Sequence, residues 1–228
     1  VLACRSEARG RAAEQQIQKA LDAQSPTRGG RAEFMLLDVG DLASIKAFAE
    51  AFSAKFDRLD LLVNNAGMKA VAHSTTVDGL ETQFGVNHIG HFALTARLFP
   101  VLRKSTAARV VHVSSISHHY VALDFDHLSA SPPQYEAMDA YRKSKLATML
   151  FAYEMDRRLK RAGIQNVLSV PCHPGVTESN LLPNLEKTYN WAIVRFVFRV
   201  VHAIPFAQSN AMGALCVLNA ATDENVVG

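Results

Sequence analysis

The sequence predicts one domain of the α/β class, with a doubly wound parallel sheet covered by helices on both faces. Three observations support this prediction. Mostly continuous apolar runs, typical of strands buried on both faces, alternate along the chain with longer stretches of helical character. The 228 residues are 49% hydrophobic and 20% charged, which is enough for a core and a polar surface. Neither an internal repeat nor a low-complexity tract divides the chain.

Strands and helices are expected to alternate from the first residue onward. The predicted strands are residues 1–4, 32–37, 59–64, 109–115 and 166–170. The predicted helices are residues 6–24, 41–56, 81–104, 140–162 and 209–221. Ser6 and Asp41 stand where helix N-caps are needed, and Gly163 ends the fourth helix. Residues 25–30 are rich in Pro and Gly and predict a loop.

The pattern changes after Pro174-Gly175. Residues 176–205 include an apolar run at 191–201 that Arg195 and Arg199 interrupt on one helical face. This run is too short and too charged to span a bilayer, so it predicts an amphipathic helix. We interpret the segment as a substrate loop within the domain. Packing over the core, a dimer contact, a substrate lid and peripheral contact with a membrane surface remain alternative roles.

Charge and cysteine content limit the partners and the compartment. Lys and Arg number 24 against 21 Asp and Glu, a net charge of +3 that is too small to predict nucleic-acid binding. Cys4, Cys172 and Cys216 are far apart and flanked by apolar residues, which predicts buried, reduced thiols. We therefore expect a reducing compartment, the cytoplasm.

The histidines were considered as metal ligands. His88 and His91 share a face of a predicted helix, and His118 and His119 are adjacent. Neither pair has carboxylate or cysteine neighbours at the spacing that metal sites need, so no metal site is predicted.

Tyr141 and Lys145 form the clearest chemical motif, at the start of the predicted helix 140–162. A spacing of four residues places the phenol and the ammonium on the same helix face. A phenol has an unperturbed pKa of about 10, and a neighbouring cation favours the phenolate. The pair can therefore act as a tuned proton donor and acceptor, although a solvated helix face explains the spacing equally well.

Further polar residues stand near the ends of predicted strands, where ligands collect in open α/β sheets. The strand at 109–115 ends in Ser114 and Ser115, and the strand at 59–64 leads into Asn-Asn-Ala-Gly at residues 64–67. Small residues there allow a flat ligand to approach the backbone. Asn87 interrupts an otherwise apolar helix, where a kink or a helix-to-helix hydrogen bond is the structural alternative.

Together these motifs resemble the short-chain dehydrogenase/reductase family from Leu2 to about Ala221. The resemblance implies a Rossmann-type, NAD(P)-binding domain over residues 1–228. Within the family, the sequence is most similar to retinol dehydrogenases and related lipid or xenobiotic carbonyl reductases, at residues 3–5, 114–118 and 140–147. The shared motifs, in the family's order, are Asn-Asn-Ala-Gly (64–67), Asn87, Ser115, Tyr-x-x-x-Lys (141–145) and Pro-Gly (174–175).

The resemblance assigns roles to four catalytic residues. Tyr141 would be the general acid in carbonyl reduction and the general base in alcohol oxidation. Lys145 would bind the nicotinamide ribose and lower the pKa of the phenol. Ser115 would hold the substrate oxygen, with Ser114 as the alternative, and Asn87 would position a water that relays protons to Lys145.

The resemblance also implies a cofactor site. Arg5 follows the first strand, where an acidic residue pairs with the free ribose hydroxyl of NAD and an arginine pairs with the 2′-phosphate of NADP, so NADP is favoured over NAD. Arg9 is a second candidate for this contact. Ser179 would contact the nicotinamide amide, with Thr177 as a competitor. The other implied cofactor-binding residues are Asp38 and Val39 at the adenine, Asn65, Ala66 and Gly67 at the adenine ribose, and Tyr141, Lys145, Pro174 and Gly175.

One family motif is not found in these 228 residues: the glycine-rich turn Thr-Gly-x-x-x-Gly-x-Gly. By resemblance it would precede Val1, bind the pyrophosphate, and follow a strand in the centre of the sheet. Two hypotheses follow. The protein is an NADP-dependent oxidoreductase acting on a hydrophobic alcohol or carbonyl compound, such as a retinoid, steroid, lipid aldehyde or xenobiotic ketone. Alternatively, it is a truncated, catalytically silent binding or regulatory protein. A homo-oligomer is a family expectation.

Overall fold

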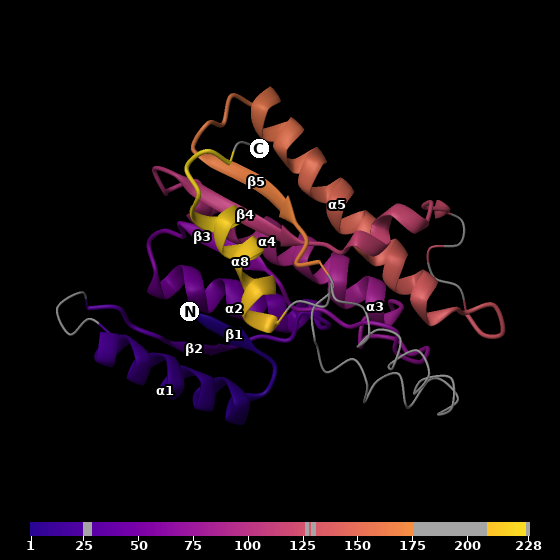
Figure 1. The fold of residues 1–228 in the computed structure, drawn as a ribbon, viewed down its shortest axis with the longest axis horizontal. Coiled ribbons are helices and arrows are strands. Elements are labelled where there is room, and N and C mark those ends of the chain that lie inside the picture. The colour runs from indigo at the N-terminus through magenta and orange to yellow at the C-terminus, as the bar shows by residue number, and fades with distance from the viewer. Residues whose placement is uncertain (25–28, 126–127, 129–130, 176–208, 227–228) are drawn as a thin grey trace.

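The computed structural model describes residues 1–24, 29–125, 128, 131–175 and 209–226 (Figure 1). Its strands are β1 (Leu2–Cys4), β2 (Phe34–Leu36), β3 (Leu61–Asn64), β4 (Ala108–Val113) and β5 (Val167–Cys172). Its helices are α1 (Glu7–Gln24), α2 (Leu42–Lys55), α3 (Thr82–Phe84), the π-helical turn η1 (Gly85–Ile89), α4 (Gly90–Leu102), the 3₁₀ turn η2 (Ile116–Tyr120), α5 (Ala137–Arg161) and α8 (Asn210–Thr222). The alternation of strands and helices confirms the predicted α/β class.

All strand pairs are parallel, but they form two sheets. β1 pairs with β2, and β3, β4 and β5 form a second sheet in that order. β1 and β3 each have one edge that pairs with no described strand. Between these two strands lies a cavity of about 960 Å³, and both strands line it. The described strands of the predicted parallel sheet are therefore divided into two groups, and the break lies where the family resemblance places a further, central strand.

Alternate residues of β4 face opposite sides of the sheet, as the pleat of a strand requires. Val110 packs in a cluster with Leu102 of α4 and Leu159 of α5. Its neighbour Val111 packs instead in a cluster with Ala220 of α8. Helices α4 and α5 thus cover one face of the β3–β4–β5 sheet and α8 covers the other (Figure 1).

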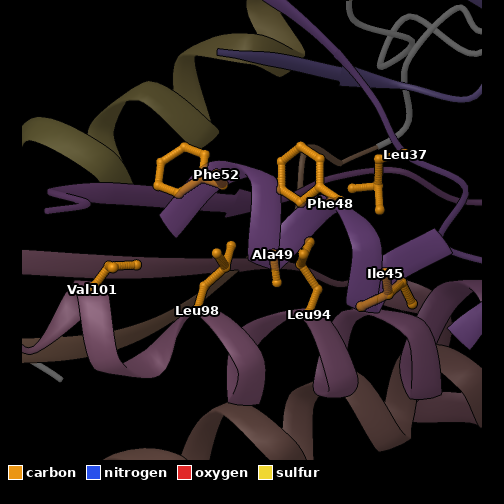
Figure 2. Close-up of a cluster of buried hydrophobic side chains, with 8 residues drawn as sticks. All are labelled: Leu37, Ile45, Phe48, Ala49, Phe52, Leu94, Leu98 and Val101. Atoms are coloured by element: carbon orange, nitrogen blue, oxygen red, sulfur yellow. The ribbon is translucent and has the colours of Figure 1, made fainter. Parts of the chain in front are cut away.

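A third apolar cluster joins α2 to α4. In Figure 2, Leu94, Leu98 and Val101 point from α4 toward α2. Ile45 and Ala49 of α2 meet them, and both are almost completely buried. This packing fixes α4, and with it the π-helical turn that precedes it, against the layer formed by α2.

Several predicted boundaries differ from those of the structure. Helix α5 begins at Ala137 because the Glu136 side chain accepts hydrogen bonds from the N–H groups of Met138 and Asp139, so Tyr141 lies in its second turn rather than at its start. β4 ends at Val113, and β5 continues through Pro171. A proline is tolerated in β5 because, among the described strands, only β4 pairs with it.

The predicted helix 81–104 contains a π-helical turn instead of being regular throughout. The N–H of Gly90 donates to Gly85 O, five residues earlier. A Cβ at Gly90 would lie 1.9 Å from Val39 O, so only glycine allows this helix to contact the loop after β2. The sequence pattern of an amphipathic helix does not reveal such a turn.

The cysteines only partly follow the prediction. All three thiols are free, Cys172 is buried, and Cys4 and Cys216 are partly buried.

Two buried histidines, His91 and His112, and the partly buried His88 should make the fold sensitive to acid. Burial lowers the pKa of His88 and His91 to about 4 and that of His112 to about 3. Between pH 6.5 and these values the unfolded chain binds protons that the folded chain does not. The free energy of unfolding should therefore fall with decreasing pH, by about 1.4 kcal/mol per pH unit for each histidine.

Urea unfolding at several pH values between 7 and 5 measures this dependence. His112→Phe keeps a ring of similar size and removes one titrating group, so its slope against pH should be smaller by about one third. An unchanged slope would show that His112 is not held neutral.

Candidate active site

Tyr141, Ser115 and Lys145 lie together where α5 passes the carboxyl end of β4. The Ser115 side chain hydrogen bonds to the Tyr141 phenol. Tyr141 is 8% exposed and Lys145 is 5% exposed, so water is largely excluded from both. Nζ of Lys145 donates to Val113 O at 2.8 Å. The structure thus brings three of the four predicted catalytic residues to one place.

The phenol pKa differs from the expectation. The resemblance implies that Lys145 lowers it, but burial raises the pKa of Tyr141, and the hydrogen bond from Ser115 opposes this shift only in part. Lys145 is not among the groups that shift the pKa of this phenol. Burial also lowers the pKa of Lys145 to about 8, which makes this lysine easy to deprotonate.

The two adjacent serines have different surroundings. Oγ of Ser114 is buried and donates to Lys145 O at 2.8 Å, so this hydroxyl is occupied within the core. Ser115 is only partly buried; its Oγ also accepts from the N–H of Ser117 and caps η2. Of the two serines, the geometry therefore favours Ser115 as the residue that faces a substrate, although Ser115 also caps the turn that follows β4.

Asn87 lies in η1 and is completely buried. Its Oδ1 accepts from the N–H of Met68 at 2.7 Å, and its Nδ2 donates to Met68 O and to Ser144 Oγ, both at 2.9 Å. The side chain therefore makes the helix-to-helix hydrogen bond that was the structural alternative. It also lies near the lysine, because a Cβ on Gly67 would be 3.3 Å from Asn87 Oδ1 and 3.5 Å from Lys145 Nζ.

The residues expected at the adenosine line one cavity, the space of about 960 Å³ between β1 and β3. Nε of Arg5 lies 3.9 Å from Asp38 Oδ2. The Asp38 side chain also accepts from the N–H of Gly40 at 2.8 Å. The predicted residues in this lining are Arg5, Arg9, Asp38, Val39, Asn65, Ala66 and Gly67.

These residues fit part of a nicotinamide dinucleotide. The Arg5 side chain is 64% exposed, so its guanidinium is accessible to an anion, and its pairing with Asp38 at this exposure is weak. Tyr141, Ser115 and Lys145 do not line this cavity. Gly67 does line it, and Gly67 also lies close to Lys145. The set matches the adenosine and ribose ends of such a cofactor, whereas the glycine-rich turn for the pyrophosphate is not found in the sequence.

Pro174 and Gly175 follow β5 after His173 and do not line the cavity. Gly175 has φ 71°, a conformation that favours glycine, and its N–H donates to His173 Nδ1 at 3.3 Å. The predictions for Ser179, Thr177, the segment 176–205 and the helix 191–201 concern residues outside the described part of the chain.

Sequence reasoning missed three residues of this site. Ser144 and Thr148 lie on the buried face of α5, in and just after the Tyr141–Lys145 motif, and both bond to Asn87. Helical spacing from Lys145 could have indicated them. Nζ of Lys69 lies 5.5 Å from the centre of the Tyr141 ring, and burial lowers its pKa. Only its position shortly after Asn-Asn-Ala-Gly pointed to Lys69.

Over the residues that the structure describes, no three His, Cys, Asp or Glu side chains are grouped so that they could hold a metal ion.

Comparison with known proteins identifies the family. A sequence model described as short chain dehydrogenase matches residues 1–190. The chain is 38% identical over 235 residues to the WW domain-containing oxidoreductase of Gallus gallus. The alignment covers 100% of this chain and 53% of that protein. It is 37% identical over 225 residues to retinol dehydrogenase 12 of Mus musculus, with 99% of this chain and 66% of that protein covered.

Solved structures agree with this assignment. A putative uncharacterized protein from Mycobacterium paratuberculosis is 33% identical, with a TM-score of 0.70 over 99% of this chain and 67% of that one. The chain spans 53% to 66% of the length of the two curated relatives named above. The chain therefore belongs to the short-chain dehydrogenase/reductase family, in the branch that contains the retinol dehydrogenases.

Proposed function

We propose that the protein is an NADP-dependent oxidoreductase that interconverts a hydrophobic alcohol and its carbonyl compound. The observation that carries this proposal is the buried Tyr141 phenol, hydrogen bonded to Ser115 and one helical turn from Lys145. A nicotinamide cofactor, when bound, supplies or takes up the hydride.

The side chains of this chain handle the proton and the charge. Tyr141 donates a proton to the carbonyl oxygen in reduction and accepts it from the alcohol in oxidation. Ser115 donates a hydrogen bond to the same oxygen and stabilises the charge that develops there. Lys145 binds the nicotinamide ribose, and its charge favours the phenolate of Tyr141 once Lys145 leaves the Val113 carbonyl. Asn87 holds the backbone near Lys145, where it positions a water that relays protons to this lysine.

The cofactor site combines two parts in this proposal. Asp38 and Val39 hold the adenine, and Asn65, Ala66 and Gly67 lie against its ribose. Arg5 pairs with the 2′-phosphate of NADP, which NAD lacks. Pro174, Gly175 and Ser179 contact the nicotinamide end.

The substrate class rests on relatives and on composition. A relative named as a retinol dehydrogenase supports a retinoid, and the apolar segment 176–205 suits a retinoid, a steroid, a lipid aldehyde or an aromatic ketone equally. None of the described helices has the length and apolar character needed to cross a bilayer. Peripheral contact with a membrane through residues 191–201, a homo-oligomer and a cytoplasmic location remain parts of the proposal.

The complete gene product that carries these residues should be screened with one carbonyl compound from each class, with NADPH and with NADH. We expect NADPH oxidation with at least one of them and slower oxidation of NADH. If no compound is reduced, and the folded protein also fails to bind NADPH in a fluorescence titration, the protein is instead the catalytically silent binding or regulatory protein.

Arg5→Gln tests the cofactor preference. Removing the guanidinium should weaken NADPH binding by about 10- to 100-fold, because a charge-assisted hydrogen bond contributes about 1.5–3 kcal/mol. NADH binding should stay unchanged. Fluorescence titration of both cofactors measures this.

Arg11→Gln is the matched control, since Arg11 lies on α1, pairs with Glu7 and Glu14, and does not line the cavity. It should leave both affinities unchanged. Equal losses of NADPH and NADH affinity in Arg5→Gln would contradict the assignment of Arg5 to the 2′-phosphate.

A further inference from the structure

Ser144 directly precedes Lys145 in α5, and the proposed function gives it no role. Its side chain is completely buried. Its hydroxyl donates to Tyr141 O at 2.7 Å and accepts from Asn87 Nδ2 at 2.9 Å. A hydroxyl has one proton and two acceptor sites, so both bonds form at the same time. Ser144 therefore joins the helix that carries Tyr141 to the π-helical turn that carries Asn87.

The Asn87 carboxamide extends this connection to the segment after β3. Its oxygen accepts from the Met68 N–H, and its nitrogen donates to Met68 O as well as to Ser144. The nitrogen carries two protons, so Ser144 and Met68 together satisfy it. Without the Ser144 hydroxyl, one N–H of a completely buried amide would have no acceptor in this set, which is unfavourable.

The segment held by Asn87 also passes close to Lys145. A Cβ on Gly67 would lie 3.3 Å from Asn87 Oδ1 and 3.5 Å from Lys145 Nζ, so only a residue without a side chain leaves this space open. Rotation of the Asn87 amide would break its bonds to Met68, the residue after Gly67, and so release backbone near the lysine.

Thr148, one turn further along α5, fixes the backbone of the same turn. Its Oγ1 donates to Asn87 O at 3.2 Å and to Ser144 O at 2.9 Å. Both the side chain and the carbonyl of Asn87 are thus bonded to α5, through two different residues.

We infer that Ser144 is a positioning residue, whose hydroxyl orients the Asn87 amide and thereby the Gly67 and Met68 backbone beside Lys145. The inference rests on the proposed function, because a displaced lysine affects turnover only if Tyr141 and Lys145 carry out the chemistry. Ser144 itself touches neither substrate nor cofactor in this role.

Ser144→Ala tests the inference, with Ser169→Ala as the matched control. Ser169 lies on β5, is equally buried, and donates to a carbonyl of the same helix, Ala152 O, at 2.9 Å. Both substitutions remove one serine hydroxyl that donates to an α5 carbonyl, but only Ser144 also accepts from Asn87. Effects that differ between the two variants therefore report the contact with Asn87.

The first readout is the pair of side-chain amide protons of Asn87 in ¹⁵N–¹H NMR spectra, which needs no turnover. We expect these signals to shift and to exchange faster with solvent in Ser144→Ala, and to stay unchanged in Ser169→Ala. The second readout is kinetic. In Ser144→Ala, kcat should fall about 10-fold or more, with KM for the carbonyl substrate unchanged, since small misplacements of catalytic groups have effects of this size.

Unchanged Asn87 signals in Ser144→Ala would overturn the inference, as would a kcat equal to that of Ser169→Ala. If Ser144→Ala does not fold, Ser144→Cys replaces it, because a thiol of similar size is a weaker donor and acceptor and should give a smaller change of the same kind. If the wild-type protein shows no turnover but the Asn87 signals change in Ser144→Ala, the proposed function is refuted and the orienting role of Ser144 is retained.

Discussion

Tyr141→Phe is expected to lower kcat for carbonyl reduction by about 10²- to 10⁴-fold, the range that a general acid contributes. Phenylalanine keeps the buried ring and its packing but has no proton to donate to the substrate oxygen. The affinity for NADPH should stay unchanged, because Tyr141 does not line the cavity between β1 and β3. Steady-state kinetics and a fluorescence titration with NADPH measure the two quantities.

Tyr153→Phe provides the control for this experiment. Tyr153 lies on the same helix but is 60% exposed, so loss of its hydroxyl should change neither kcat nor affinity. Turnover retained by Tyr141→Phe at the level of Tyr153→Phe would exclude Tyr141 as the proton donor.

Lys145→Met should separate stability from activity. In the folded chain burial lowers the pKa of Lys145 to about 8, whereas an unfolded lysine has a value of about 10.5. Between these values the unfolded state binds the additional proton, so the free energy of unfolding should rise with pH by about 1.4 kcal/mol per unit on account of this group. Lys145→Met removes this contribution, and its stability should depend less on pH in that range.

The contribution of Lys145 is obtained as the difference in free energy of unfolding between the wild type and Lys145→Met at each pH. Burial raises the pKa of Tyr141 and raises that of Cys172 to about 12, and both groups change stability in the opposite sense at high pH. They are present in both proteins, so their own contributions cancel in the difference. What remains is the titration of Lys145 together with its mutual effect with Cys172, since Lys145 lowers the pKa of this thiol. Urea unfolding from pH 7 to 10 gives the curves, and Lys160→Met, an exposed lysine of the same helix, should behave as the wild type.

The same Lys145→Met protein should lose turnover, because the methionine can neither bind a ribose hydroxyl nor favour a phenolate. An unchanged pH dependence of stability would mean that Lys145 is not held in the low-dielectric site described above. Retained turnover would mean that its ammonium is not needed in catalysis.

Much of the fold could be predicted from local patterns. Apolar strands and capped helices located all five described strands and most helices to within a few residues. The π-helical turn before Gly90 is an exception, because it depends on the close approach of Val39 O, which is distant in sequence. The gap between β1 and β3 lies where the family resemblance places a central strand.

The candidate site shows the same division. Helical spacing predicted that Tyr141 and Lys145 share one face, which is a local property, and the family resemblance implied that Ser115 joins them. It could not predict that Lys145 bonds to Val113 O, nor that burial raises the pKa of the Tyr141 phenol. Nor could it predict that Asn87 bonds to Ser144, since this contact joins η1 and α5, which are separated along the chain by α4, β4 and η2.

Transfer of deuterium from NADPH to the substrate is the most direct test of the proposed oxidoreductase. The complete gene product is incubated with a carbonyl substrate found in the screen and with NADPH deuterated at C4 of the nicotinamide ring. The alcohol formed is then analysed by mass spectrometry. We predict deuterium on the carbinol carbon with the wild-type protein and none above background with Tyr141→Phe. Alcohol without deuterium at that carbon, or equal transfer by the two proteins, would contradict the account.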